Sequence, residues 1–111
     1  MVISDEVRYR ILKLLEANPT LSQREVAREL GMSLGRANYC LRALIDKGWV
    51  KVANFKNSRN KSAYMYLLTP RGIERKAEVT VRFLQRKTRE YQELRAEIEL
   101  IRADARRVQG R

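Results

Sequence analysis

The chain has 111 residues, enough for one small domain with at most an appended element. It carries 24 lysines and arginines against 13 aspartates and glutamates, a formal net charge of +11. An excess of this size predicts a polyanionic partner, either nucleic acid or an anionic membrane surface. The sequence has no histidine, no cluster of metal ligands and no glycine-rich phosphate loop. We therefore expect no enzyme, no cofactor and no metal.

The N-terminal sequence and the cysteine content favour a cytoplasmic protein. MVISDEVRYR lacks the apolar core of a signal peptide, and the single Cys40 cannot form an internal disulfide. No segment approaches the roughly 18 apolar residues that a transmembrane helix needs. We expect Cys40 to act as a small buried hydrophobe and the chain to have no membrane partner.

The positive charge is concentrated in the middle of the chain. Residues 1–31 hold five basic and five acidic groups, and residues 70–111 mix twelve basic with seven acidic groups. Residues 32–62 instead hold seven basic groups against Asp46 alone. A solvated surface normally mixes both signs, so this segment is predicted to bind phosphate.

Two short helices are expected at the start. The first covers residues 5–17 after Ser4 and ends before Pro19, since the residue before a proline leaves helical geometry. The second follows a capping box formed by Ser22 and Glu25 and ends at Gly31. Their apolar positions, expected to face inward, are Val7, Ile11, Leu14 and Leu15 in the first helix and Val26, Ala27 and Leu30 in the second.

The third helix, within residues 33–49, has two different faces. Ser33 is a good N-cap and Gly48 is a typical helix end. One stripe is apolar, namely Ala37, Leu41, Leu44 and Ile45, whereas the other carries Arg36, Asn38, Tyr39 and Arg42. An ordinary amphipathic helix with a solvated basic face gives the same pattern. Only Met32 separates Gly31 from Ser33, however, so the second and third helices form a helix-turn-helix.

Two strands then predict a wing. Trp49–Phe55 alternates Val50 and Val52 with polar or small residues, and AYMYLL at 63–68 is rich in β-prone side chains. The tip between them, KNSRNK at 56–61, has three cations and no acid. A solubilising turn is the simpler interpretation of such a tip. Next to a basic recognition helix, we favour a wing that contacts the phosphate backbone or the minor groove.

Residues 4–75 resemble the winged helix-turn-helix of MarR-type regulators. The resemblance is carried by LSQREVARELGMS (21–33), YCLRALIDKGWV (39–50) and the LT-x-x-G pattern within LLTPRG (67–72). The segment NYCLRALIDKGWVKVANFKNS (38–58) more specifically resembles small MarR-like regulators associated with exopolysaccharide gene clusters. The resemblance implies a dimeric transcriptional regulator that binds duplex DNA, with an inverted repeat as its expected site. Asn57 stands where larger MarR proteins carry an aspartate, and the absent extra N-terminal helix leads us to expect a reduced or missing ligand pocket.

The DNA-binding residues are expected on three elements. The resemblance assigns base and phosphate contacts to Arg36, Asn38, Tyr39 and Arg42, and the wing arginine to Arg59. Gly35 would let the helix backbone approach the duplex closely, and the amides at the start of the second helix would contact phosphate. The remaining predicted contacts are Ser22, Gln23, Arg24, Ser33, Lys56, Asn57, Ser58 and Lys61.

Winged helices also serve as RNA-binding modules and as protein–protein adaptors. Tyr39, Tyr64 and Tyr66 would be candidates for stacking on RNA bases. Tyr64 and Tyr66, however, share one face of a strand, and we expect both in the core. An adaptor does not require such a concentration of positive charge on the helix and the wing.

The last segment predicts one long helix that mediates dimerisation. Thr69-Pro70 starts it, and no proline or glycine follows Gly72 until Gly110. Heptad positions a are Ala77, Leu84, Tyr91, Ile98 and Ala105, and positions d are Ile73, Thr80, Lys87, Leu94, Ile101 and Val108. Its first half adds Val79, Val81 and Phe83 and should pack on the domain and its partner. Leu84, Tyr91, Leu94, Ile98 and Ile101 are the predicted dimer contacts.

Charges beside this seam favour a parallel pair. Positions g hold Glu90, Glu97 and Asp104, and positions e hold Arg95, Arg102 and Gln109. A helix that folds back on its own domain or frays is the alternative. The predicted organisation is a mainly α chain (α+β class), with a winged helix-turn-helix domain at 1–69 and a C-terminal dimerisation helix at 70–111.

Overall fold

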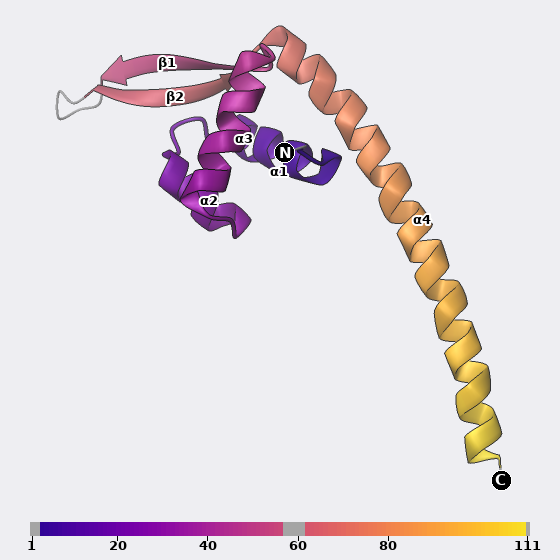
Figure 1. The fold of residues 1–111 in the computed structure, drawn as a ribbon. Helices are drawn as coiled ribbons and strands as arrows, with labels where there is room; N and C mark the ends of the chain where they lie inside the picture. Colours follow the sequence, from indigo (N-terminus) through magenta and orange to yellow (C-terminus); the bar gives the residue numbers. More distant parts are fainter. Residues whose placement is uncertain (1–2, 57–61, 111) are drawn as a thin grey trace.

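The computed structural model describes residues 3–56 and 62–110 of the chain (Figure 1). The described elements are α1 (Asp5–Ala17), α2 (Gln23–Leu30), α3 (Leu34–Asp46), β1 (Val50–Lys56), β2 (Ser62–Leu68) and α4 (Pro70–Gln109). The three short helices form a compact body, the hairpin projects from it, and α4 leads away from it (Figure 1). The predicted fold, a winged helix-turn-helix followed by a long helix, is confirmed.

Each helix begins at a hydroxyl side chain that satisfies an amide of the first turn. Ser4, Ser33 and Thr69 accept hydrogen bonds from the amides three residues on, at 3.0–3.2 Å. Ser22 and Glu25 form the complete predicted capping box. Loss of one such cap costs about 1 kcal/mol, so these residues fix where the helices start.

Two glycines in left-handed conformation end α2 and follow α3. Gly31 has φ +65° and Gly48 has φ +77°, values that L-residues with a side chain rarely adopt. The amide of Met32 bonds to the carbonyl of Ala27, so α2 closes and α3 starts almost at once. The short turn fixes the angle between the two helices.

The core lies where α1, α2, α3, the base of the hairpin and the first part of α4 meet. Its largest fully buried side chains are Ile11, Leu12, Leu15, Val26, Cys40, Leu41, Leu44, Val50 and Val79. Leu12 was not among the expected inward positions. It is buried because α1 contacts α2, β2 and α4, which cover more than one stripe of the helix. Val7, Leu14, Leu30 and Ile45, expected inward, are only partly buried at the edge of this core.

The hairpin is attached at its base and leaves the body towards its tip. Val50 pairs with Leu68, and Asn54 pairs with Tyr64, in an antiparallel register. The amide of Tyr66 also donates to the carbonyl of Pro19, at 2.9 Å, which ties β2 to the loop between α1 and α2. On the inner face, exposure rises outward, from 2% to 43% between Val50 and Val52.

The expectation that both strand tyrosines are in the core is therefore wrong for one of them. Tyr66 is 7% exposed, but Tyr64 is 64% exposed. The two side chains share a face, yet Tyr64 lies one step further out, beyond the body that covers Tyr66. The alternation of side chains along a strand shows which residues share a face. It does not show at which residue the strand extends beyond the body of the domain.

The first half of α4 packs on α1 and on the turn after α3. A Cβ at Gly72 would lie 1.9 Å from the carbonyl oxygen of Trp49, so only glycine permits this crossing. Val79 is fully buried, and the Phe83 ring lies 5.2 Å from that of Tyr9. Val81, expected to pack as well, is 55% exposed in the single chain because it lies on another side of the helix.

Ion pairs fasten the same half of α4 to α1. Basic residues of α4 contact acidic residues of α1 in the pairs Lys76–Glu16, Arg82–Asp5, Arg86–Glu6 and Lys87–Glu6, at 2.8–3.9 Å. Arg82 and Arg8, which both bond to Asp5, hold the pKa of that carboxyl below its ordinary value despite partial burial. Beyond this contact the rest of α4 runs away from the body and does not fold back on it (Figure 1).

Candidate nucleic-acid interface

Helix α3 packs against the core with one face and exposes the opposite face to solvent. Ala37, Cys40, Leu41 and Leu44 are fully buried under it. Tyr39 and Arg42 are exposed on the opposite side, and Arg36 and Asn38 are half-buried at its edges. Tyr39 and Arg42 therefore occupy the outer side of α3, and Arg36 and Asn38 flank them at its two edges.

Two of the predicted contacts bond to each other. The Asn38 side-chain amide donates to Gln23 Oε1 at 3.0 Å, across the two helices of the helix-turn-helix. This bond fixes the outer edges of α2 and α3 relative to one another. It uses one N–H of Asn38, so the Asn38 carbonyl oxygen, the second Asn38 N–H and the Gln23 NH2 group can still form hydrogen bonds.

At the start of α2, the capping box already uses part of the predicted phosphate site. Ser22 accepts from the Glu25 amide at 3.1 Å, and the Ser22 amide donates to the Glu25 carboxylate at 3.2 Å. That carboxylate lies where a phosphate would approach the helix terminus. The amides of Gln23 and Arg24, which precede the first intrahelical bond, are the ones left for a ligand.

Gly35 lies in the first turn of α3 with open space around it. Apart from its chain neighbours and the backbone of its own helix, no atom of the described chain lies within 4 Å of the position that a Cβ would occupy there. Gly35 is also exposed, so the fold itself does not require a glycine at this position. Its small size matters only if something outside the chain approaches the helix.

Tyr64, which the sequence did not assign to this surface, lies beside it, and Lys51 is a further exposed cation on the hairpin. Tyr64 lines a hollow of about 530 Å³ together with Thr20, Ser22 and Gln23, between the wing and the start of α2. Lys51 is exposed on β1, close to the end of α3 in the chain. The unopposed positive charge of residues 32–62 already pointed to Lys51, whereas the position of Tyr64 depends on the tertiary structure.

The wing tip itself lies outside the described residues. The predictions for Asn57, Ser58, Arg59 and Lys61 concern that part of the chain, as does the side chain of Lys56. The described strands bring both ends of this segment to the far end of the hairpin (Figure 1).

Cys40 is a packing residue. It is fully buried under α3, as predicted, and burial raises the pKa of its thiol although the nearby Arg36 opposes the shift. A thiol with a raised pKa is a poor nucleophile at neutral pH.

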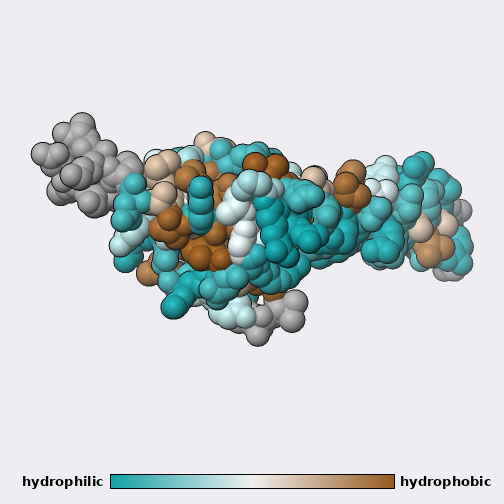
Figure 2. All heavy atoms as spheres, turned by 90° about the horizontal axis from the view of Figure 1, so that it is seen from above, coloured by the Kyte–Doolittle hydropathy of each residue, from teal (hydrophilic) through white to brown (hydrophobic). Residues whose placement is uncertain are grey.

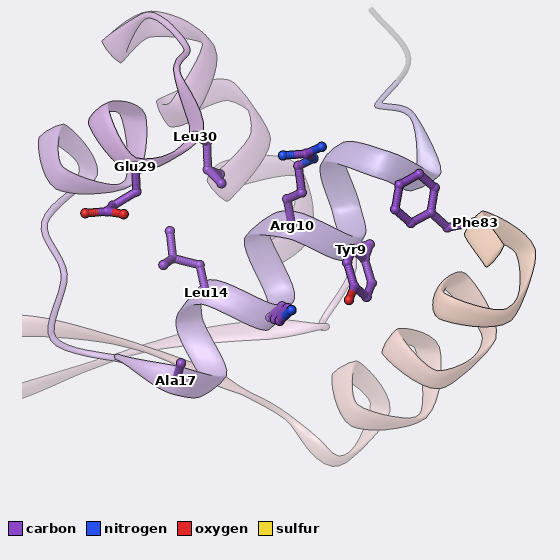
Figure 3. Close-up of a pocket in the computed structure, with 8 residues that line it drawn as sticks. Tyr9, Arg10, Leu14, Ala17, Glu29, Leu30 and Phe83 are labelled. Atoms are coloured by element: carbon purple, nitrogen blue, oxygen red, sulfur yellow. The ribbon is translucent and has the colours of Figure 1, made fainter. Parts of the chain in front are cut away.

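A second, mostly apolar groove lies on α1, α2 and α4. It has a volume of about 440 Å³, and Leu14 and Leu30 face each other across it beside the Tyr9–Phe83 contact (Figure 3). Arg10, Lys13 and Glu29 contribute its charged groups. None of its lining residues belongs to α3 or the hairpin, so the groove is separate from the candidate nucleic-acid interface.

The part of the chain that the structure describes contains neither a cluster of metal ligands nor a membrane-spanning helix. No group of three or more acidic or cysteine side chains there could hold a metal ion. Across residues 3–56 and 62–110, no helix combines the length and the apolar character needed to cross a bilayer.

Residues 4–51 match a family model described as winged helix-turn-helix DNA-binding. The match covers the three short helices and the beginning of β1, somewhat less than half of the chain. No curated protein matches the sequence.

Solved structures of bacterial regulators have a similar fold. PcaV, a transcriptional regulator from Streptomyces coelicolor, shares 21% identity at a TM-score of 0.62, over 88% of this chain and 72% of PcaV. A point mutant of S. aureus MepR shares 19% identity at a TM-score of 0.60, over 98% of this chain and 79% of MepR. A MarR/EmrR family regulator from Acinetobacter sp. ADP1 shares 23% identity at a TM-score of 0.57, over 78% of this chain.

These comparisons define the class of fold. The chain has a winged helix-turn-helix of the DNA-binding type, in the arrangement found in regulators of the MarR family. It spans 58% of the length of the Acinetobacter regulator, so parts of that protein have no counterpart here.

Proposed function

We propose that the chain is a MarR-family transcriptional regulator that binds duplex DNA as a homodimer. The observation that carries the proposal is the outer face of α3, where Tyr39 and Arg42 are exposed, Arg36 and Asn38 lie at the edges, and a fully buried stripe lies beneath. An α-helix fits the major groove, and arginine and asparagine are the side chains that recognise guanine and adenine there. The matched family model describes DNA-binding winged helices, which supports this function over an enzyme.

In this proposal the elements around α3 hold the DNA backbone. The hairpin extends to one side of the helix-turn-helix, in the position of a wing (Figure 1). Lys51 and the cations at the tip of the hairpin would contact phosphates or the minor groove. The start of α2 would contact phosphate through Gln23 and Arg24. Such contacts set orientation and affinity, and the α3 side chains set sequence preference.

The dimer is proposed from the apolar seam of α4. Leu84, Tyr91, Leu94, Ile98 and Ile101 are 42–64% exposed in the single chain. Figure 2 shows apolar patches between hydrophilic surfaces along the part of α4 that leaves the body. A series of exposed apolar side chains at heptad spacing favours pairing with the same helix of a second copy.

The charges along the seam support parallel pairing of the distal halves. Glu90 already bonds within its own helix to Arg86 and Lys87, which lowers the pKa of its carboxyl. Lys87, at a d position, likewise turns towards Glu6 of α1. Arg102 likewise bonds within its own helix, to Glu99 at 3.1 Å, and would have to exchange that contact for Glu97 of a second chain. In this proposal the coiled coil proper would begin at Tyr91, beyond the contact of α4 with α1.

Binding measured against salt concentration tests the DNA interface. With 4–7 phosphates neutralised per protomer, log K should fall with log salt at about −0.9 per phosphate. Replacement of Lys56, Arg59 and Lys61 by alanine should flatten that slope and preserve sequence preference. Arg36→Ala should instead relax preference at one or two base pairs, at a cost of about 1–3 kcal/mol.

The matched control is Arg89→Ala, which removes the same charge from an exposed position on α4. It should leave both slope and preference nearly unchanged. A triple wing variant that keeps the parental slope would show that the wing is not a phosphate clamp.

RNA binding is the second candidate, and one observation favours it. Tyr39 and Tyr64 are exposed by 42% and 64%, as side chains that stack on unpaired bases must be. Competition between duplex DNA, duplex RNA and single-stranded RNA separates the two functions. Preference for single-stranded RNA, lost in Tyr64→Ala, would favour the RNA module over the regulator. A protein adaptor would bind none of the three.

We extend the proposal to the genes of exopolysaccharide synthesis, on the resemblance of residues 38–58. A regulator of this kind acts in the cytoplasm, where the DNA is. Transcript levels in a strain that lacks this gene would test the extension without affecting the proposal of DNA binding.

A further inference from the structure

A basic hollow lies at the C-terminal end of α3, where the chain passes into β1 and α4 begins. Its volume is about 440 Å³. Arg8, Lys47, Arg71, Arg75 and Arg82 surround it, together with Trp49 and Glu78. We call it the Trp49 hollow. It combines side chains from α1, from the turn after α3 and from the first turns of α4.

The positive charge of the Trp49 hollow is only partly neutralised. Glu78 bonds to Arg75 at 2.8 Å, and Asp5 bonds to both Arg82 and Arg8 at 2.9–3.3 Å. In the described part of the chain, Lys47 and Arg71 form no ion pair. Two acids therefore face five cations, an excess that favours an anionic ligand.

Two of these cations lie over the indole ring. The Arg8 guanidinium is 5.8 Å and the Lys47 ammonium is 5.5 Å from the ring centroid of Trp49. Arg8 Nε is buried and has no hydrogen-bond partner among the described residues. A buried donor without an acceptor is unfavourable, and an oxyanion in the hollow would supply one after a small turn of the side chain.

The framework of the Trp49 hollow is tightly held. The Thr69 amide donates to the Trp49 carbonyl at 3.0 Å, and the Thr69 hydroxyl donates to the Gly48 carbonyl. Gly72 packs directly against the same Trp49 carbonyl. The cations are thus carried by elements whose relative positions are fixed, which reduces the entropy lost when a ligand binds.

We propose that the Trp49 hollow binds a phosphate-bearing anion, a phosphate monoester or pyrophosphate. Several guanidinium groups around one space match the multiple oxygens and the double negative charge of a phosphate better than those of a single carboxylate. Two sources offer this chemistry, a free phosphate compound and the DNA backbone. An occupant would connect α1, the end of α3 and α4, and so link the DNA-reading unit to the proposed dimer helix. The inference does not depend on the proposed DNA-binding function.

Trp49 makes the test direct because it is the single tryptophan of the chain. The full chain is titrated with sodium pyrophosphate while chloride keeps the ionic strength constant, and tryptophan emission is recorded. We expect a saturable change, and calorimetry under the same conditions detects binding that leaves the emission unaltered. Absence of both a saturable emission change and a saturable heat would overturn the proposal.

Matched variants distinguish specific binding in the Trp49 hollow from non-specific electrostatic binding of an anion to a basic protein. Arg71→Gln should weaken pyrophosphate binding at least tenfold, whereas Arg89→Gln, which removes the same charge outside the hollow, should leave it unchanged. Lys47→Gln is a second variant in case the first does not fold, as judged by its circular dichroism melting curve. Equal weakening by Arg71→Gln and Arg89→Gln would contradict the proposal.

A final titration in the presence of saturating duplex DNA identifies the source. Unchanged affinity for pyrophosphate would assign the hollow to a free phosphate compound. Competition, with a shallower salt slope of DNA binding in Arg71→Gln, would assign it to a backbone phosphate. Each result supports a phosphate site at this position.

Discussion

The two halves of α4 place similar side chains in opposite environments. In the first half, Val79 is fully buried and Gly72 permits close contact with Trp49. In the second half, Leu94, Ile101 and Val108 are 55–74% exposed although the helix continues unbroken. The first half is part of the core of its own chain, whereas the second has apolar side chains and nothing of its own chain to cover them. Under the proposed dimer, the distal half is the part of α4 that a second chain would cover.

The largest effects should come from a leucine in each region. Leu41→Ala empties part of the core and should lower the free energy of unfolding by about 2–5 kcal/mol, measured by urea titration at low protein concentration. Leu94→Ala should leave that value nearly unchanged and weaken self-association at least tenfold in sedimentation experiments. The comparison would fail if Leu94→Ala destabilised the isolated chain as much as Leu41→Ala does.

Two helical glycines sharpen the contrast between a buried and an exposed site. Gly72→Ala places a Cβ against the Trp49 carbonyl, which should destabilise the fold by about 1–3 kcal/mol. Gly35→Ala adds its Cβ to open space, so its melting temperature should not fall. Its affinity for DNA should fall, however, if the backbone of α3 approaches the duplex. A Gly35→Ala protein with parental affinity would contradict that close approach.

The smallest effect concerns the ion pairs that dock α4 on α1. Arg82 and Arg8 lower the pKa of Asp5 below its ordinary value, so the ionised carboxylate stabilises the fold at any pH above the pKa that Asp5 has in the unfolded chain. This contribution is lost as the pH falls through the lowered pKa. Asp5→Asn should therefore cost up to about 1 kcal/mol at pH 7. Urea unfolding of both proteins at pH 7 and pH 3 should show the difference shrinking at the lower pH, and a constant difference would rule out the charge as its cause.

Local signals in the sequence predicted the secondary structure well. Ser33, Gly31 and the Ser22–Glu25 capping box act on backbone within a few residues, so their roles could be inferred without the rest of the fold. Cys40 was predicted correctly as well, because its place beside an apolar stripe indicated burial.

The sequence alone was insufficient where distant segments meet. Tyr64 shares its strand face with the buried Tyr66, and only the way the hairpin leaves the body exposes it. The Asn38–Gln23 bond depends on the angle between two helices. The Arg82–Asp5 pair joins residues 77 positions apart, which no periodicity along the chain indicates.

Selection of bound duplexes from a random pool, with the full chain, tests the account most directly. We expect enrichment of an inverted repeat, because a two-fold pair of α4 helices would present two α3 helices to successive major grooves, about 34–36 Å or a multiple of it apart. Enrichment of a single half-site would contradict the proposed dimer but would still agree with sequence recognition by α3. Enrichment of no sequence at all would contradict the central claim that the outer face of α3 reads DNA.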